Sequence, residues 1–337
     1  MPYRGDHWSL AGAVMVGVAA VAVVVVAITA GSGEKSAAPP RPSAPVESPA
    51  PNQPLSGFGF SAVEDPSAHQ LVLFGGVDSY DTTWLWDGHR WALAHPPVNP
   101  PGRFGAAAAY DPLTRVVMLY GGRLGPGDVV DDTWAWDGRT WTELDSGKGS
   151  PPAGEGSRMA WDDILNEMVL VNGGGSSGGE TWLCNGNHWV RQPRGDLPAG
   201  TFVGGMAVDP LTRALLAASA PGQGRASTWE WDGTAWREVS TRTNPPAFVG
   251  LVLDPASDRL ILWGDPAVGA GRQMWSWSGQ DWIPLAGTGL PVSPEAEVTD
   301  TNGGHVLILG SLVQASQGAP QPIDLWSWSG STWNQLA

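Results

Sequence analysis

Six copies of one tryptophan motif set the strongest constraint on how this chain can fold. In each copy a tryptophan is followed two residues later by a second, then by Asp-Gly or a near equivalent, and a last tryptophan stands five residues after the second position. The copies are Trp84/Trp86/Trp91, Trp134/Trp136/Trp141, Trp182/Cys184/Trp189, Trp229/Trp231/Trp236, Trp275/Trp277/Trp282 and Trp326/Trp328/Trp333. They recur every 46 to 51 residues, a period that is typical of a β-propeller built from one repeated sheet.

The second copy shows how one blade forms. Residues 104–110 and 116–120 are apolar runs joined by Asp-Pro, a turn signal, and a double glycine ends the second run. Side chains alternate along a strand, so Trp134 and Trp136 share one face of the next strand, and Trp141 on the last strand pairs opposite one of them. Four antiparallel strands in simple order, with one aromatic face, make a propeller blade. The sequence therefore predicts an all-β fold, a six-bladed β-propeller of four-stranded antiparallel blades.

This propeller takes up residues 56–337, and shorter segments precede it. The expected blades cover residues 58–98, 103–145, 157–193, 202–240, 248–286 and 295–337. Residues 9–30 are an uncharged apolar run, long enough to cross the roughly 30 Å hydrocarbon layer of a membrane. We expect an uncleaved transmembrane anchor, because the apolar core of a signal peptide is shorter, about 7 to 15 residues. Small residues near the end of the run leave a cleaved signal peptide open as the alternative.

The segment after the apolar run bears on location. Residues 31–55 are rich in Pro, Ala and Ser and predict a semi-extended linker that holds the propeller away from a surface. We therefore expect residues 1–8 to be cytoplasmic and the propeller to be exported, in a single-pass membrane protein. The basic residues on the two flanks of the run do not decide this orientation.

Composition excludes several partners and chemistries. The formal net charge of -15 disfavours nucleic acid as a partner. Cys184 is the only cysteine, so no disulfide can form within the chain, and we expect a small buried hydrophobe at this position. The histidines are scattered, and no pair has metal-ligand spacing. The sequence therefore predicts no metal site and no cofactor.

The repeat resembles the kelch repeat. Gly75-Gly76, Gly121-Gly122 and Gly173-Gly174 match its double glycine, and the last tryptophan of each motif matches its tryptophan. In the last three copies the double glycine is replaced. The resemblance implies a propeller that binds proteins, as most kelch propellers do, or an enzyme in a minority of cases, such as galactose oxidase. The copper site of that enzyme needs two tyrosines and two histidines, and copper-radical chemistry is not expected here.

The connections between strands predict where a ligand would bind. In a four-stranded meander the short Asp-Pro and Asp-Gly turns lie on one face, here called the turn face, and the long connections lie on the opposite face, here called the loop face. Binding sites usually reside on loops carried by a rigid scaffold, so we expect a site on the loop face or at the mouth of the central channel. The candidate residues are Asp78, Tyr80, Arg103, Arg123, Asp131, Asp132, Arg158, Glu180 and Arg272. Each of them can instead fix a loop by hydrogen bonds.

The function that this pattern favours is a binding module without catalysis. We expect a membrane-anchored, exported propeller that binds a protein or a glycan at the cell envelope. A cell-envelope enzyme that acts on carbohydrate at the central channel is the alternative, and ionisable side chains converging at the channel mouth would favour it. No catalytic residue can be named from the sequence. Each blade is complete in itself, so we expect the ring to close by packing of the first blade against the sixth, and this seam to open first.

Overall fold

The computed structural model describes the propeller region of the chain with gaps. The described residues are 52–54, 58–76, 81–144, 149–154, 156–172, 179–186, 188–199, 201–219, 226–245, 248–264, 273–285, 289, 292–311 and 322–337. They belong to one compact unit, residues 50–337. The expected anchor and most of the expected linker lie outside the described residues. Among the residues that are described, no helix has the length and apolar character needed to cross a membrane.

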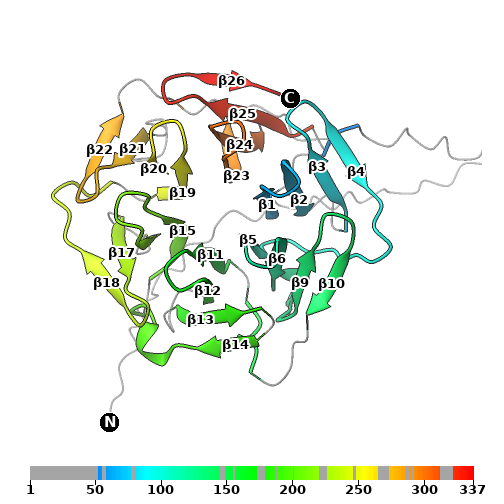
Figure 1. Cartoon of the computed structure of the whole chain (residues 1–337), viewed down its shortest axis with the longest axis horizontal. Coiled ribbons are helices and arrows are strands. Elements are labelled where there is room, and N and C mark those ends of the chain that lie inside the picture. The colour runs from blue at the N-terminus through cyan, green and yellow to red at the C-terminus, as the bar shows by residue number, and fades with distance from the viewer. Residues whose placement is uncertain are drawn as a thin grey trace, which may run out of the picture. The chain divides into compact units, whose positions relative to one another are not determined.

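Six four-stranded antiparallel sheets make up the described part of this unit, as the tryptophan motif predicted (Figure 1). The first strands of the blades are β1 (Phe60–Asp65), β5 (Ala107–Asp111), β11 (Arg158–Asp162), β15 (Val203–Val208), β19 (Phe248–Asp254) and β23 (Ser293–Asp300). The second strands are β2 (Gln70–Gly75), β6 (Val116–Tyr120), β12 (Glu167–Asn172), β16 (Leu215–Ser219), β20 (Arg259–Gly264) and β24 (His305–Ser311). The third strands are β3 (Thr83–Trp86), β9 (Thr133–Trp136), β13 (Glu180–Asn185), β17 (Ser227–Trp231), β21 (Gln273–Trp277) and β25 (Asp324–Trp328). The fourth strands are β4 (Trp91–Ala94), β10 (Trp141–Leu144), β14 (His188–Arg191), β18 (Trp236–Val239), β22 (Trp282–Leu285) and β26 (Trp333–Gln335).

The blades stand around a common axis. The first strands are innermost and the fourth strands are outermost (Figure 1). Each first strand contacts the first strand of the next blade, and β23 of the last blade contacts β1 of the first. Two short elements are additional: a hairpin of β7 (Arg123–Gly125) and β8 (Asp128–Val129), where the sequence indicated a loose loop, and the 3-10 helix η1 (Pro193–Gly195) between blades 3 and 4.

The Asp-Gly turns bring the tryptophans together. The last tryptophan of a motif pairs directly opposite the second position, as Trp141 does with Trp136, and their ring centroids are 5.5 Å apart. In this turn the Asp137 carboxylate accepts hydrogen bonds from two backbone amides, and Gly138 adopts a φ of 90°, which glycine reaches without strain. Cys184 holds the second position in blade 3 and is 2% exposed, which confirms the expectation of a buried cysteine. Burial raises the pKa of its thiol to about 12.

A repeated hydrogen bond joins neighbouring blades. The indole N–H of the last tryptophan in one blade donates to a buried threonine hydroxyl in the preceding blade, here called the latch. The latches are Trp141 to Thr83 (2.9 Å), Trp189 to Thr133 (3.0 Å), Trp236 to Thr181 (3.0 Å) and Trp282 to Thr228 (2.8 Å). Blades 5 and 6 carry Met274 and Leu325 in place of the threonine. Correspondingly, the buried indole nitrogens of Trp333 and Trp91 have no hydrogen-bond partner among the described residues.

The first and sixth blades close the ring. They share one apolar cluster, which includes Trp91 of blade 1 and Leu325 of blade 6. At the edge of this cluster the Glu64 carboxylate accepts hydrogen bonds from the Thr301 hydroxyl and the Asn302 side-chain amide, both at 2.8 Å. The residues before β1 add one bond, from the amide of Ile323 to the carbonyl of Pro54. Closure therefore combines packing with hydrogen bonds, and the order in which the blade interfaces open stays a prediction.

Candidate binding site at the channel mouth

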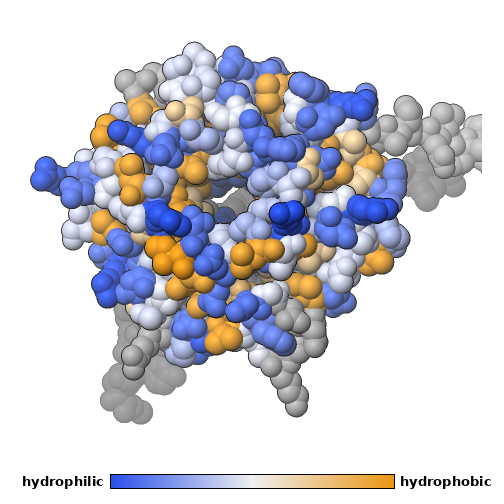
Figure 2. All heavy atoms as spheres, in the orientation of Figure 1, coloured by the Kyte–Doolittle hydropathy of each residue, from blue (hydrophilic) through white to orange (hydrophobic). Residues whose placement is uncertain are grey.

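A cavity of about 330 Å³ opens on the loop face where the central channel begins. It is lined by the starts of the first strands of blades 1, 2, 3 and 6, and most of its wall consists of glycine, alanine and serine. These small side chains leave room between strands that converge on the axis. Figure 2 shows the opening at the centre of the ring, in the view along the axis.

Phenylalanines surround this cavity. Phe58 is 64% exposed and meets Phe104 edge to face, with ring centroids 5.9 Å apart. Phe202 is 48% exposed and lies beside Gly156, another residue that lines the cavity. Exposed aromatic rings around a cavity present apolar surface to a ligand. Removing this surface from water on binding is favourable, so the rings stabilise a bound ligand. Phe58, Phe104 and Phe202 are here called the aromatic rim.

Arg158 extends from the first residue of β11 into the channel wall. Its Nε donates to the carbonyl of Gly204 in blade 4 at 2.7 Å, and its Nη1 donates to the carbonyl of Ser157 at 3.1 Å. Burial lowers the pKa of the guanidinium, and the Glu297 carboxylate acts in the opposite sense. An arginine keeps its charge in such surroundings, so the wall of the channel carries a fixed positive charge.

Glu297 supplies the opposite charge from the far side of the ring. It lies on β23 of blade 6 and accepts a hydrogen bond from the backbone amide of Leu251. Burial raises the pKa of this carboxyl to about 7, against the attraction of Arg158 and the Leu251 hydrogen bond. Gly250 leaves room for the Glu297 carboxylate, since a Cβ on residue 250 would stand 2.6 Å from Oε1 of Glu297. The channel mouth thus combines a cation, a carboxyl group that titrates near neutral pH, and an apolar rim.

Two of the expected ligand residues have a structural role. Arg103 is 1% exposed, and its Nη2 donates to Oδ2 of Asp132 at 2.8 Å. The same guanidinium donates to the carbonyls of Pro101 and Gly121, and Asp132 also accepts from the indole of Trp134 at 2.7 Å. This buried ion pair fixes the connections of blade 2 on the loop face.

The other expected residues are dispersed. Glu180 accepts from the indole of Trp182 and pairs with Arg191 at 3.3 Å. Arg123 bonds through its backbone to Phe104, and Asp131, in the same connection of blade 2, is exposed. Asp78, Tyr80 and Arg272 lie outside the described residues. Of the expected residues that the structure describes, Arg158 alone lines the channel cavity.

Sequence reasoning missed Glu297 and the aromatic rim. The rim had a visible signal, because phenylalanine occurs at or just before the first strand in four of the six copies, as Phe58, Phe104, Phe202 and Phe248. Glu297 had none, since it sits in a copy whose first half lacks the Asp-Pro turn that four other copies carry. Within the described ranges, no group of three His, Cys, Asp or Glu side chains is placed to hold a metal ion.

Comparison with known proteins identifies the fold but no family. No family profile matches the sequence, and no curated protein matches it significantly. The solved structure of YjhT is similar with a TM-score of 0.58 at 12% identity, over 85% of this chain and 99% of that chain. AofleA from Arthrobotrys oligospora gives 0.56 at 14% identity, over 84% and 86% of the two chains. A variant of the Aleuria aurantia lectin in complex with α-methyl-L-fucoside gives 0.56 at 14% identity, over 85% and 96%. At these identities the likeness shows the β-propeller fold alone.

Proposed function

We propose that this chain is a glycan-binding propeller of the kelch type that a transmembrane segment holds on the outer side of a membrane. The observation that carries the proposal is the aromatic rim around a cavity that contains Arg158 and Glu297. Saccharides present apolar ring faces and many hydroxyl groups. A site for them therefore needs exposed aromatic surface beside a few fixed donors and acceptors.

The fold comparison supports this ligand class. A propeller of similar fold binds α-methyl-L-fucoside, so the architecture is compatible with sugar recognition. The location rests on the apolar run at residues 9–30 and the Pro-rich linker at 31–55, which suit an anchored domain exposed to envelope glycans. A protein ligand on the same rim is the other partner that the kelch resemblance favours.

The proposal is tested with the full chain in detergent on an array of envelope and cell-surface glycans. Phe58→Ala and Phe202→Ala should each weaken binding about tenfold, because each removes exposed apolar contact worth about 1.4 kcal/mol. Leu113→Ala is the matched control, since Leu113 is 65% exposed but lies in the β5–β6 turn on the opposite face. Retention of no glycan, or equal losses in all three variants, would reject a glycan site at the channel mouth.

One observation favours a second candidate, an enzyme that acts on carbohydrate. A carboxyl group with a pKa of about 7, as Glu297 has, can act as a general acid at neutral pH, and Glu295 lines the same cavity. Glycoside hydrolysis uses two carboxyl groups in this way. Under this alternative, Glu297→Gln would abolish hydrolysis of a bound glycan while leaving its binding intact. Under the binding proposal, neither the parent chain nor the Glu297→Gln variant hydrolyses a glycan that it binds.

A further inference from the structure

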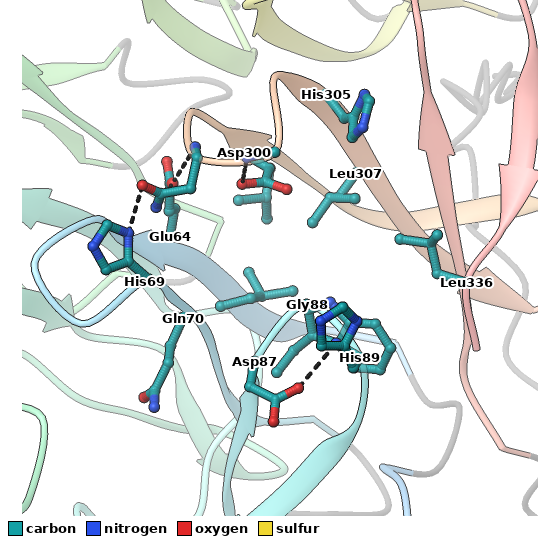
Figure 3. Close-up of a pocket in the computed structure, with 15 residues that line it drawn as sticks. Glu64, His69, Gln70, Asp87, Gly88, His89, Asp300, His305, Leu307 and Leu336 are labelled. Carbon is teal, nitrogen blue, oxygen red and sulfur yellow. Dashed lines mark hydrogen bonds between the residues drawn. The ribbon is translucent and has the colours of Figure 1, made fainter.

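A second cavity, of about 390 Å³, lies on the turn face between blades 1 and 6 (Figure 3). The β1–β2, β3–β4 and β23–β24 turns surround it, and Leu336 near the end of the chain stands at its rim. This cavity, here called the seam pocket, shares no lining residue with the cavity at the channel mouth. Its volume is in the range of sites that bind small molecules, about 300 to 1,000 Å³.

In the turn that faces the seam, blade 6 has a glycine at a position where blade 3 has a leucine. Between blades 3 and 4, Leu165 packs over the Asp-Gly turn, with a carbon 3.3 Å from where a Cβ on Gly233 would stand. In blade 6 the position that corresponds to Leu165 is Gly303. Nothing lies within 4 Å of the same point at Gly88, the glycine that faces the seam, and the same is true at Gly138 and Gly186. The contact that Leu165 makes between blades 3 and 4 therefore has no counterpart at the seam.

The floor of the pocket is apolar. Leu71, Trp86, Val298 and Leu307 line it and are 2 to 5% exposed. They come from both blades, so a bound molecule would contact each side of the seam. Leu336 extends the apolar surface to the rim, where it is 41% exposed.

Polar groups stand above the floor. The Nδ1 of His305 is buried and has no hydrogen-bond partner among the described residues. Asp300 uses Oδ1 to accept from the amide of Gly303, and the His89 ring is exposed on the opposite wall. Figure 3 shows Asp300, His305 and His89 around one opening. A buried nitrogen without a partner is costly, so a ligand hydroxyl that bonds to His305 after the imidazole turns toward the pocket would relieve that cost.

The charge of the lining selects the ligand. Glu64, Asp87 and Asp300 line the pocket, and none of its lining residues in the described part is a lysine or an arginine. Hydrogen bonds from the Arg90 and His89 backbone amides lower the pKa of Asp87, which keeps that carboxylate charged. Anionic groups such as phosphates and uronic acids would be repelled here.

We propose that the seam pocket is a second binding site, which takes an uncharged hydroxylated ring such as a neutral monosaccharide unit. One apolar face of the ring would rest on the floor, and its hydroxyl groups would bond to Asp300 and His305. The inference rests on the proposed function only in taking glycans as the ligand class. Two sites on opposite faces would let one propeller bridge two glycan chains, with an avidity above that of either site alone.

The test is titration of the full chain in detergent with methyl glycosides of neutral hexoses and of uronic acids, followed by calorimetry and by saturation-transfer NMR. His305→Phe and Leu336→Trp each fill the pocket with a larger side chain. Leu336 lies at the exposed rim, so the test can still be made with Leu336→Trp if His305→Phe does not fold. His89→Ala removes a wall group without removing a hydrogen bond of its ring, and Arg139→Ala in the corresponding turn of blade 2 is its matched control. We expect two binding components for a neutral glycoside. The seam component should be at least tenfold weaker in the three pocket variants and unchanged in Arg139→Ala and Phe58→Ala. The channel-mouth component should weaken in Phe58→Ala and stay unchanged in the pocket variants.

The outcomes separate this site from the channel mouth. Neutral glycoside binding that persists in the pocket variants but disappears in Phe58→Ala overturns the seam site and leaves the proposed function standing. Binding that depends on the pocket alone supports the seam site and rejects the channel mouth as the site of glycan binding. Uronic acid glycosides that bind the pocket as tightly as neutral ones overturn the inference from charge, and absence of all glycoside binding overturns the seam site and the glycan proposal together.

Discussion

The latch between Trp141 and Thr83 gives the most direct test of what holds the blades together. The Thr83 side chain is fully buried and Trp141 is 1% exposed, so water cannot replace the hydroxyl when it is removed. Thr83→Val keeps the branched shape and removes the acceptor. A buried donor left without a partner costs about 1–3 kcal/mol, and we expect a loss of about 2 kcal/mol in the free energy of unfolding. For a domain of this size that loss corresponds to a fall of about 3–4 °C in Tm.

The assay is urea denaturation of the full chain in mild detergent, with circular dichroism as the probe. The midpoint should fall while the slope m is unchanged, because the surface exposed on unfolding stays the same. The control is a double-mutant cycle with Trp141→Phe, which has no N–H to satisfy. In that background Thr83→Val should cost less than about 0.5 kcal/mol. An equal cost in both backgrounds would show that packing, and not the hydrogen bond, explains the loss.

The ion pair, the channel carboxyl group and the seam give further tests. Arg103→Met leaves Asp132 without its partner and should cost about 3 kcal/mol, measured by thermal unfolding; a cost under about 1 kcal/mol would contradict a structural ion pair. Glu297 has a folded pKa of about 7 against an ordinary value of 4.5, so the native state holds its proton more tightly and stability falls as pH rises between these values. Glu297→Gln should therefore be more stable than the parent at pH 8 by about 2–3 kcal/mol and equal to it near pH 4, as read from urea midpoints. Leu325→Thr offers an acceptor to Trp91 and should slow amide hydrogen exchange at the seam, and faster exchange there than in the parent would refute it.

Much of the fold could be predicted from the sequence because its determinants are local and repeated. The spacing of two tryptophans, a glycine that adopts positive φ and a last tryptophan specifies one hairpin, and six copies specify six blades. The direct pairing of Trp136 with Trp141 is one of the two registers that strand alternation allows. The buried carboxylates of the β1–β2 type turns follow the same logic, since Asp111 accepts from the backbone amides of Leu113 and Thr114.

The candidate site was less predictable because it depends on how blades face one another across the ring. Arg158 and Glu297 are 139 positions apart in the chain and come from blades 3 and 6. No local pattern indicates that both side chains line the same cavity and influence each other's pKa. Arg103 and Asp132 illustrate the converse, since their charge and loop position suggested a ligand site, and their burial shows a bidentate pair within one blade. Charge on a loop indicates a site only when the side chain is left without internal partners.

Blade 6 departs from the repeat in ways that coincide with both cavities. It lacks the Asp-Pro turn, it has Leu325 where four other blades have a threonine, and its turn carries Gly303 where blade 3 has a leucine. The change at Leu325 removes a latch and the change at Gly303 removes a leucine contact of the kind seen between blades 3 and 4, and hydrogen bonds from Thr301 and Asn302 to Glu64 join blades 6 and 1 instead. The same blade contributes Glu297 to the channel mouth and Asp300 and His305 to the seam pocket. The stability of the ring depends on the pattern that the blades share. Blade 6 lacks part of that pattern and places ionisable side chains at two cavities, so we expect ligands to bind at this blade.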